Sequence, residues 1–179
     1  DSGMSRGLGD VYKRQAYNGH ATPWHQDGQY WPIRPLATCT VWLAVDDANE
    51  ENGCLKFIRG SHRDKNLKQH EFNKDKNLTL HQELLKSEFN EKESVNLILK
   101  RGQISLHDVY LVHGSDANLS SKSRRGMTMR FMPTTSVFDH NLAKEKYNNL
   151  NVSKYSNRKI YLARGYDKSK RNNLEVVNF

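Results

Sequence analysis

The chain has 179 residues, of which 36% are hydrophobic and 27% charged, and its formal net charge is +8. This length and apolar content suffice for one domain with a hydrophobic core, so the composition excludes a wholly disordered chain. No apolar run approaches the roughly 20 residues of a membrane helix, and the Lys and Arg residues are scattered over the last two thirds of the chain. We therefore expect neither a membrane nor a nucleic acid as partner, but a solvated basic surface.

The first fifteen residues, DSGMSRGLGDVYKRQ, are rich in glycine and lack periodicity. They match no targeting pattern, so for 1–15 we expect a non-native or disordered leader outside the fold. For 16–179 we expect one domain, with its core over 22–135 and a C-terminal extension over 136–179. The two cysteines, Cys39 and Cys54, form no CxxC pair and favour reduced thiols in a cytoplasmic protein.

Short runs of β-forming residues follow one another along the chain. The stretches 37–45, 54–58, 95–99, 103–112 and 127–132 are predicted strands, separated by turn-forming clusters. The lysine-rich stretch 63–93 is predicted to be a long surface excursion with a modest helical pattern near Leu80, Leu84 and Leu85. Several strands with few helices indicate an all-β sandwich or barrel.

The stretch TPWHQDGQYWP, residues 22–32, places His25 and Asp27 two positions apart. On a strand, residues i and i+2 point to the same side, so both side chains can reach one point. Two histidines and one carboxylate on one face of a metal are typical of non-haem Fe(II) oxygenases. The missing histidine is predicted to be His113, after the strand 103–112, with His107 as a rival because it shares that strand and its face.

Arg124 follows His113 by eleven residues, and Arg125 stands beside it. A dicarboxylate co-substrate on the metal needs a cation for its distal carboxylate, and the planar guanidinium can bind it with two hydrogen bonds. Strand parity alone does not choose between the two arginines. An HxD triplet also arises by chance, and the three tryptophans could be ordinary core residues.

Four ordered stretches carry a resemblance to a known family: TPWHQDGQYWPIRP, ENGCLKFIRGSHR, LHDVYLVHGSDAN and RFMPTT. Together they resemble the phytanoyl-CoA dioxygenase family of Fe(II)/2-oxoglutarate oxygenases over roughly 22–133. The resemblance implies an all-β core folded as a double-stranded β-helix (a cupin-like jelly roll) with surface loops and few short helices. It implies the iron ligands His25, Asp27 and His113. It also implies a 2-oxoglutarate site of Arg124 (or Arg125), Trp42, Gln26 and Ser115.

The activity implied by the resemblance is that of a dioxygenase using Fe(II), 2-oxoglutarate and O2. It would hydroxylate a small polar or anionic metabolite or an acyl-CoA and release succinate and CO2, with the iron centre as the catalytic group and no separate acid or base. Asp27 argues against the halogenating relatives, which lack this carboxylate. Family members carry a long region before TPWHQD, so we expect an N-terminally truncated domain. The alternative is a non-catalytic cupin-like domain that binds metal or small molecules and has lost activity through truncation.

Overall fold

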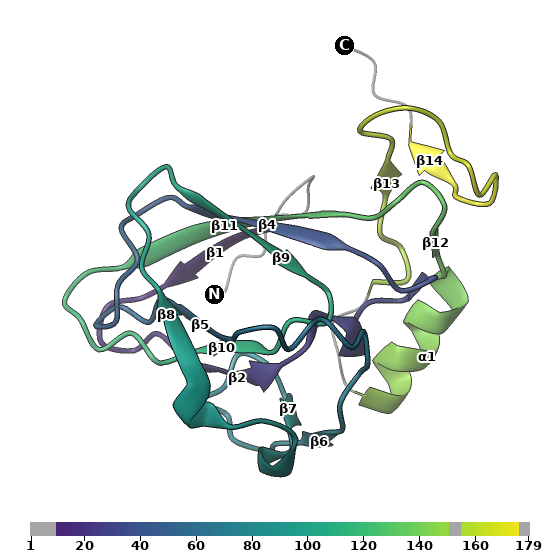
Figure 1. Cartoon of the computed structure of the whole chain (residues 1–179). Coiled ribbons are helices and arrows are strands. Elements are labelled where there is room, and N and C mark those ends of the chain that lie inside the picture. Colours follow the sequence, from purple (N-terminus) through teal and green to yellow (C-terminus); the bar gives the residue numbers. More distant parts are fainter. Residues whose placement is uncertain (1–9, 151–154, 176–179) are drawn as a thin grey trace.

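The computed structural model describes residues 10–150 and 155–175, and two antiparallel four-stranded sheets form its body (Figure 1). In the order of pairing, the first sheet consists of β1 (Asp10–Arg14), β11 (Arg124–Phe131), β4 (Cys39–Ala44) and β9 (Ile104–Asp108). The second consists of β2 (Thr22–His25), β10 (His113–Ser115), β5 (Leu55–Ile58) and β8 (Ser94–Leu97). Strands distant in sequence are thus neighbours in both sheets, which confirms the predicted jelly-roll fold.

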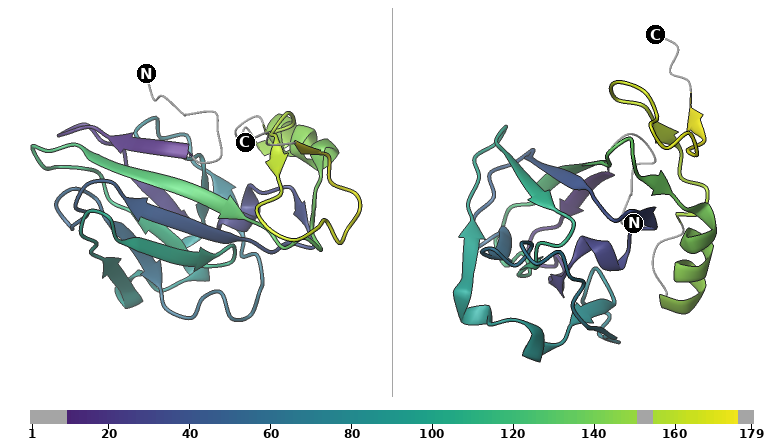
Figure 2. Two further views of the ribbon diagram at one scale, coloured as in Figure 1. Left: turned by 90° about the horizontal axis from the view of Figure 1, so that it is seen from above. Right: turned by 45° about the vertical axis from the view of Figure 1, so that its right-hand side comes forward.

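Three two-stranded pairs and short helices complete the described chain, and Figure 2 shows how they extend from the two sheets. The pairs are β3 (Ile33–Arg34) with β12 (Val137–Phe138), β6 (His70–Phe72) with β7 (Gln82–Leu84), and β13 (Ile160–Tyr161) with β14 (Leu174–Glu175). The helices are η1 (Asp27–Gln29), η2 (Lys86–Glu88), η3 (Glu91–Glu93) and α1 (His140–Leu150). Within the described ranges, no helix has the length and apolar character to cross a membrane.

Each of the three tryptophans lies in a different buried apolar cluster. Trp24 packs with Ile58, Leu84 and Val112, whereas Trp42 packs with Ala44, Ala48, Cys54 and Leu99. Trp31 packs with Ile33, Val109, Phe138 and Ala143 beside α1. The burial of large aromatic rings contributes strongly to the core, so the interpretation of the tryptophans as core residues is correct for all three. Both cysteines are free thiols, Cys39 exposed and Cys54 buried.

The leader expected over 1–15 is wrong for its last third. Residues 10–14 form β1, which pairs with β11 from Asp10 opposite Thr128 to Arg14 opposite Arg124. The strand depends on a partner more than a hundred residues away, which local sequence patterns cannot reveal. Residues 1–9 of the expected leader lie outside the described residues.

Two further predictions of secondary structure are wrong. The predicted strand 103–112 ends early, since β9 stops at Asp108. A turn in which Leu111 N donates to Asp108 O (3.1 Å) then leads to β10, which begins at His113 and belongs to the other sheet. The excursion 63–93 contains the hairpin β6–β7 and contributes buried Leu84 to the core, and the helical pattern near Leu84 is a strand. In both places tertiary pairing overrides the local pattern.

The outer face of the first sheet carries adjacent apolar side chains. Val41 on β4 lies between Leu106 on β9 and Met129 on β11, and Leu43 lies between Ile104 and Met127. Ile104 and Leu106 are exposed. We call these six residues the outer apolar face. Contiguous exposed apolar surface of this kind favours association.

Candidate metal centre

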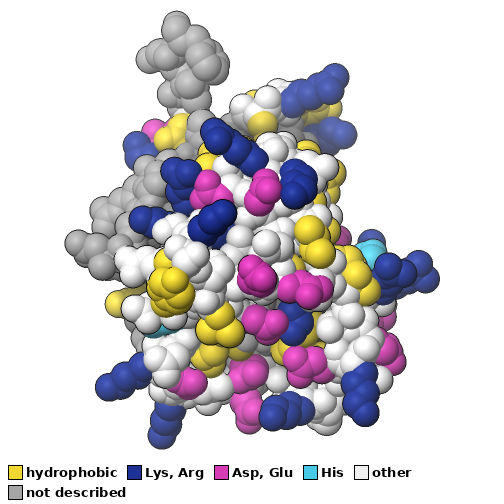
Figure 3. Space-filling view, turned by 90° about the vertical axis from the view of Figure 1, so that its left-hand side faces the viewer, with side chains coloured by type: hydrophobic (Ala, Val, Ile, Leu, Met, Phe, Trp, Pro, Cys, Tyr) yellow, Lys and Arg dark blue, Asp and Glu magenta, His cyan; other side chains and the backbone are white. Residues whose placement is uncertain are grey.

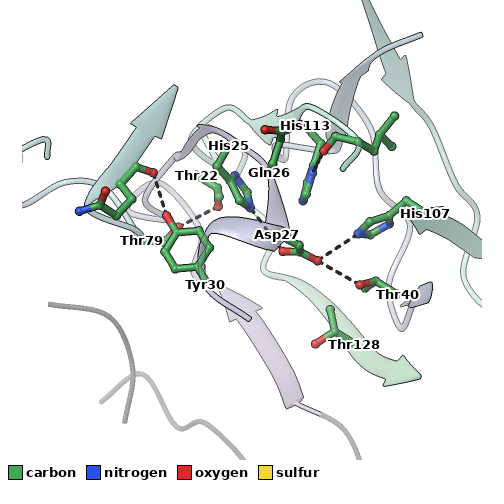
Figure 4. A network of polar contacts seen from close by, with 12 residues as sticks. Thr22, His25, Gln26, Asp27, Tyr30, Thr40, Thr79, His107, His113 and Thr128 are labelled. Atoms are coloured by element: carbon green, nitrogen blue, oxygen red, sulfur yellow. Dashed lines mark hydrogen bonds and ion pairs between the residues drawn. The ribbon is translucent and has the colours of Figure 1, made fainter. Parts of the chain in front are cut away.

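His25 and His113 converge because their strands are neighbours. β2 and β10 pair antiparallel with His25 opposite His113, and the centroids of the two imidazole rings are 4.2 Å apart. Asp27 joins them, and ligand atoms of the three residues all lie within 4.8 Å of one another (Figure 4). All three residues are buried. The structure therefore brings together the three predicted iron ligands.

Asp27 follows the strand and opens a turn. β2 ends at His25, Gln26 keeps an extended backbone (φ −117°, ψ 133°), and Asp27 is the first residue of η1. The extended Gln26 preserves the i, i+2 relation, so Asp27 still points to the side of His25. The turn is fixed because Tyr30 N and Trp31 N donate to Asp27 O at 3.0 and 3.3 Å, and Gly28 N donates to Val109 O at 3.0 Å.

Both histidine rings are held in the tautomer that a metal requires. Nδ1 of His25 lies 2.8 Å from Pro23 O, and Nδ1 of His113 lies 2.9 Å from Leu111 O. A carbonyl oxygen only accepts, so each Nδ1 carries the proton and each Nε2 keeps its lone pair for a ligand. Burial, together with the neighbouring His25 and His107, lowers the pKa of His113 well below its ordinary value. His113 is therefore neutral, as a metal ligand must be.

The Asp27 carboxylate is held at one oxygen and open at the other. Oδ2 accepts a hydrogen bond from Thr40 Oγ1 (3.0 Å) and lies 3.7 Å from both Arg130 Nε and His107 Nε2. Oδ1 lies 3.7 Å from His25 Nε2. Burial would raise the pKa of Asp27, but the positive charge of Arg130, together with the neighbouring His107 and His25, holds it well below its usual range. The carboxylate is thus ionised, with Oδ1 directed toward the histidines.

These donors fit a divalent iron. Two neutral imidazole nitrogens and one carboxylate oxygen form a buried set, and each ligand is oriented by a hydrogen bond behind it. His107, the rival ligand, projects from β9 of the facing sheet beside Asp27, with its ring centroid 4.8 Å from that of His113. It lies outside the three-residue group found among the described residues. Sequence reasoning did not identify Thr40 and Arg130, because their strands meet Asp27 only in the folded chain.

The two candidate arginines point to opposite faces of β11. Arg124 is 1% exposed, and its Cζ lies 5.2 Å from the centroid of the Trp42 ring. Arg125 faces outward, where its Nε and Nη2 donate to the carboxylate of Asp46 at 2.9 and 2.7 Å. The interior therefore receives Arg124. Gly126 makes room for the indole, since a Cβ there would stand 2.4 Å from Trp42 Cζ2.

Gln26 and Ser115, also expected near the co-substrate, have different surroundings. The Gln26 side chain braces loops: Nε2 donates to Asn66 O (3.0 Å) and Tyr110 O (2.7 Å), and Oε1 accepts from Lys68 N (2.8 Å). Both polar atoms of the Gln26 amide therefore bond to main-chain groups. Ser115 is buried in β10, two residues after His113, and its hydroxyl accepts a hydrogen bond from Arg14. Arg14 was missed because it lies in the expected leader.

Comparisons with known proteins agree with this geometry. The chain is 32% identical over 128 residues to a "Phytanoyl-CoA dioxygenase domain-containing protein 1 homolog" of Caenorhabditis briggsae, covering 68% of this chain and 44% of that protein. A homologue of the same description from Dictyostelium discoideum is 32% identical over 130 residues, covering 70% and 45%. The chain thus spans less than half the length of these relatives.

A solved structure and a family model extend the comparison. The crystal structure of EvdO2 from Micromonospora carbonacea var. aurantiaca complexed with 2-oxoglutarate superposes with a TM-score of 0.60 at 26% identity, covering 69% of this chain and 50% of EvdO2. The family model described as "Phytanoyl-CoA dioxygenase (PhyH)" matches residues 8–126, which includes β1 and all three candidate ligands. The chain belongs to the phytanoyl-CoA dioxygenase (PhyH) family of Fe(II)- and 2-oxoglutarate-dependent oxygenases.

Proposed function

We propose that this chain forms the catalytic core of a dioxygenase that hydroxylates a small anionic or polar metabolite or an acyl-CoA. The observation that carries the proposal is the buried group of His25, Asp27 and His113, whose ligand atoms lie within 4.8 Å of one another in a chain of this family. When bound, iron with 2-oxoglutarate and O2 supplies the oxidising chemistry, which yields succinate, CO2 and a hydroxylated product.

The protein residues position the reactants and keep water out. Nε2 of His25 and of His113 and Oδ1 of Asp27 would hold the metal, while Thr40 and Arg130 keep the carboxylate ionised and oriented.

The interior next to the metal group suits the distal carboxylate of 2-oxoglutarate. Arg124 would bind this carboxylate through its guanidinium, and the hydroxyl of Ser115 would add a hydrogen bond. Trp42 packs against Arg124 and limits the space along the co-substrate. Charge-assisted hydrogen bonds of this type are about twice as strong as neutral ones.

The charge of the interior supports an anionic substrate. Among the described residues, the buried charged side chains are Arg14, Arg124 and Asp27, and Arg130 lies against Asp27 at the edge of the site. Three of these side chains are positive and one is negative, and the charges of Fe(II) and 2-oxoglutarate cancel. Positive charge that is poorly solvated favours binding of an anion. On the surface seen in Figure 3, basic side chains alternate with acidic ones, which suits a small molecule better than a nucleic acid.

Two measurements test the proposal. Anaerobic addition of Fe(II) and 2-oxoglutarate should produce a weak visible charge-transfer band, and the Asp27→Ala variant should not show it. With O2 admitted, succinate should form fastest with one member of a panel of acyl-CoA thioesters, amino-acid derivatives and phosphonates. A folded parent protein without the band contradicts the proposal. A band without substrate-stimulated succinate favours the non-catalytic binding domain.

A further inference from the structure

Arg14 joins the two sheets inside the barrel. It lies at the end of β1 directly opposite Arg124 on β11, and it is 2% exposed. Its Nη2 donates to Thr22 Oγ1 of β2 (2.6 Å) and to Ser115 Oγ of β10, and its Nη1 donates to the main-chain oxygen of Asp116. A single guanidinium of the first sheet is therefore fixed on the two strands that carry the metal ligands.

The hydrogen bond from Arg14 sets the direction in which the Ser115 hydroxyl can donate. A guanidinium only donates, so Ser115 Oγ accepts this bond and its own proton remains available for another acceptor. Because the positive guanidinium of Arg14 lies beside the Ser115 hydroxyl, an anion is the acceptor that these two groups favour. The close packing of Gly53 supports a fixed position for the guanidinium: a Cβ there would stand 3.0 Å from Arg14 Nη1, and its backbone φ is +74°.

The pairing of Arg14 with Arg124 points to the same ligand. Residues directly opposite on antiparallel strands have Cβ atoms about 4.5–5.5 Å apart. A carboxylate beside both guanidinium groups would be attracted by both positive charges. Both arginines belong to the first sheet, and Ser115 faces them from the second.

We propose that Arg14 is a second positioning residue for the distal carboxylate of 2-oxoglutarate. It acts through Ser115, whose hydroxyl it holds as a donor, and it adds positive charge beside Arg124. The inference rests on the proposed function, because it concerns the co-substrate of the same site. It assigns a role to a strand that the sequence patterns had placed outside the domain.

The test compares two ligands that differ only at the distal group. 2-Oxopentanoate has a methyl group where 2-oxoglutarate has its C5 carboxylate. Binding of each to the Fe(II)-loaded protein is titrated without O2, by the charge-transfer band or by calorimetry. Arg14→Met should raise the Kd for 2-oxoglutarate by roughly 10- to 100-fold and that for 2-oxopentanoate by less than about 3-fold. Arg14→Lys should recover part of the preference for 2-oxoglutarate over 2-oxopentanoate, because lysine keeps the positive charge but lacks the planar guanidinium.

Three controls separate positioning from a structural role. Lys13→Met, on the exposed neighbour in β1, should change neither Kd. Ser115→Ala combined with Arg14→Met should weaken 2-oxoglutarate binding by less than the product of the two single effects, since both act on one carboxylate. Arg14→Gln keeps an amide donor without the charge, and it replaces Arg14→Met if that variant does not fold.

The outcomes distinguish this inference from the proposed function. If Arg14→Met weakens both ligands equally, or leaves the preference for 2-oxoglutarate unchanged, Arg14 only ties the sheets together and the inference is wrong. If the parent protein prefers 2-oxoglutarate in that same experiment, the proposed function still stands. If the parent binds neither keto acid with Fe(II), both are wrong.

Discussion

Gly126 is the position where one added methyl group should disturb the co-substrate site without touching a metal ligand. A Cβ on Gly126 would stand 2.4 Å from Trp42 Cζ2, 2.7 Å from Cε2 and 3.0 Å from Nε1. The indole is 5% exposed on the paired strand β4, so it cannot move aside freely. Overpacking of this kind costs about 1–3 kcal/mol. For a chain of this size, that lowers the Tm of Gly126→Ala by roughly 2–12 °C.

The displaced ring should also weaken binding of 2-oxoglutarate, because Trp42 packs on Arg124 at 5.2 Å. We expect about a tenfold higher Kd, corresponding to roughly 1.4 kcal/mol, with Fe(II) affinity unchanged. Thermal unfolding and anaerobic titration measure the two effects. Trp42→Phe shortens the ring and should make the double variant more stable than the sum of the single effects predicts. An unchanged Tm for Gly126→Ala would refute the close packing on which this reasoning depends.

Four further outcomes follow from the geometry. His25→Ala and His113→Ala should abolish Fe(II) binding in equilibrium dialysis, whereas His107→Ala should retain iron. If His107→Ala loses iron and His113→Ala retains it, His107 is the ligand and His113 is not. Arg124→Ala should raise the apparent constant for 2-oxoglutarate by roughly 10- to 100-fold, with Arg125→Ala, on the outer Asp46 pair, as the matched control. Burial lowers the pKa of His70 from 6.5 to about 4 in the folded protein. As the pH drops from 6.5 toward 4, His70 is therefore protonated in the unfolded chain before it is protonated in the folded one, and the free energy of unfolding should fall. Urea unfolding should show a smaller loss for His70→Gln over that range. Leu106→Lys should reduce concentration-dependent association through the outer apolar face, measured by sedimentation velocity. If parent and variant associate equally, the outer apolar face is not the surface through which the chain associates.

The meeting of the three candidate ligands could be predicted because their sequence signals are local. The HxD spacing needs only an extended Gln26 between its two ligands, and the structure has it. His113, and not His107, is the third member of the buried group, although the predicted strand 103–112 ends at Asp108 and His113 begins a strand of the other sheet. The motif HGS identified the residue even where the secondary structure was wrong.

The surroundings of the metal centre could not be predicted, because they depend on the pairing of distant strands. Thr40 and Arg130 reach Asp27 from β4 and β11, and Arg14 reaches Ser115 from β1. None of these contacts leaves a periodic or spaced signal in the sequence. Gln26 was expected at the co-substrate from the family resemblance alone, and its amide bonds to the main chain at Asn66 and Tyr110.

The two halves of the site therefore depend on different parts of the fold. His25 and His113 belong to β2 and β10, neighbours within one sheet, and their orientation comes from carbonyl groups two residues away. Arg14 and Arg124 belong to the other sheet, and Arg14 reaches Ser115 only while the two sheets stay in place. Loss of the Arg14 contact between the sheets should thus reduce 2-oxoglutarate binding while the two histidines still hold iron. Loss of a histidine ligand should remove the metal first, and with it the band that reports the co-substrate.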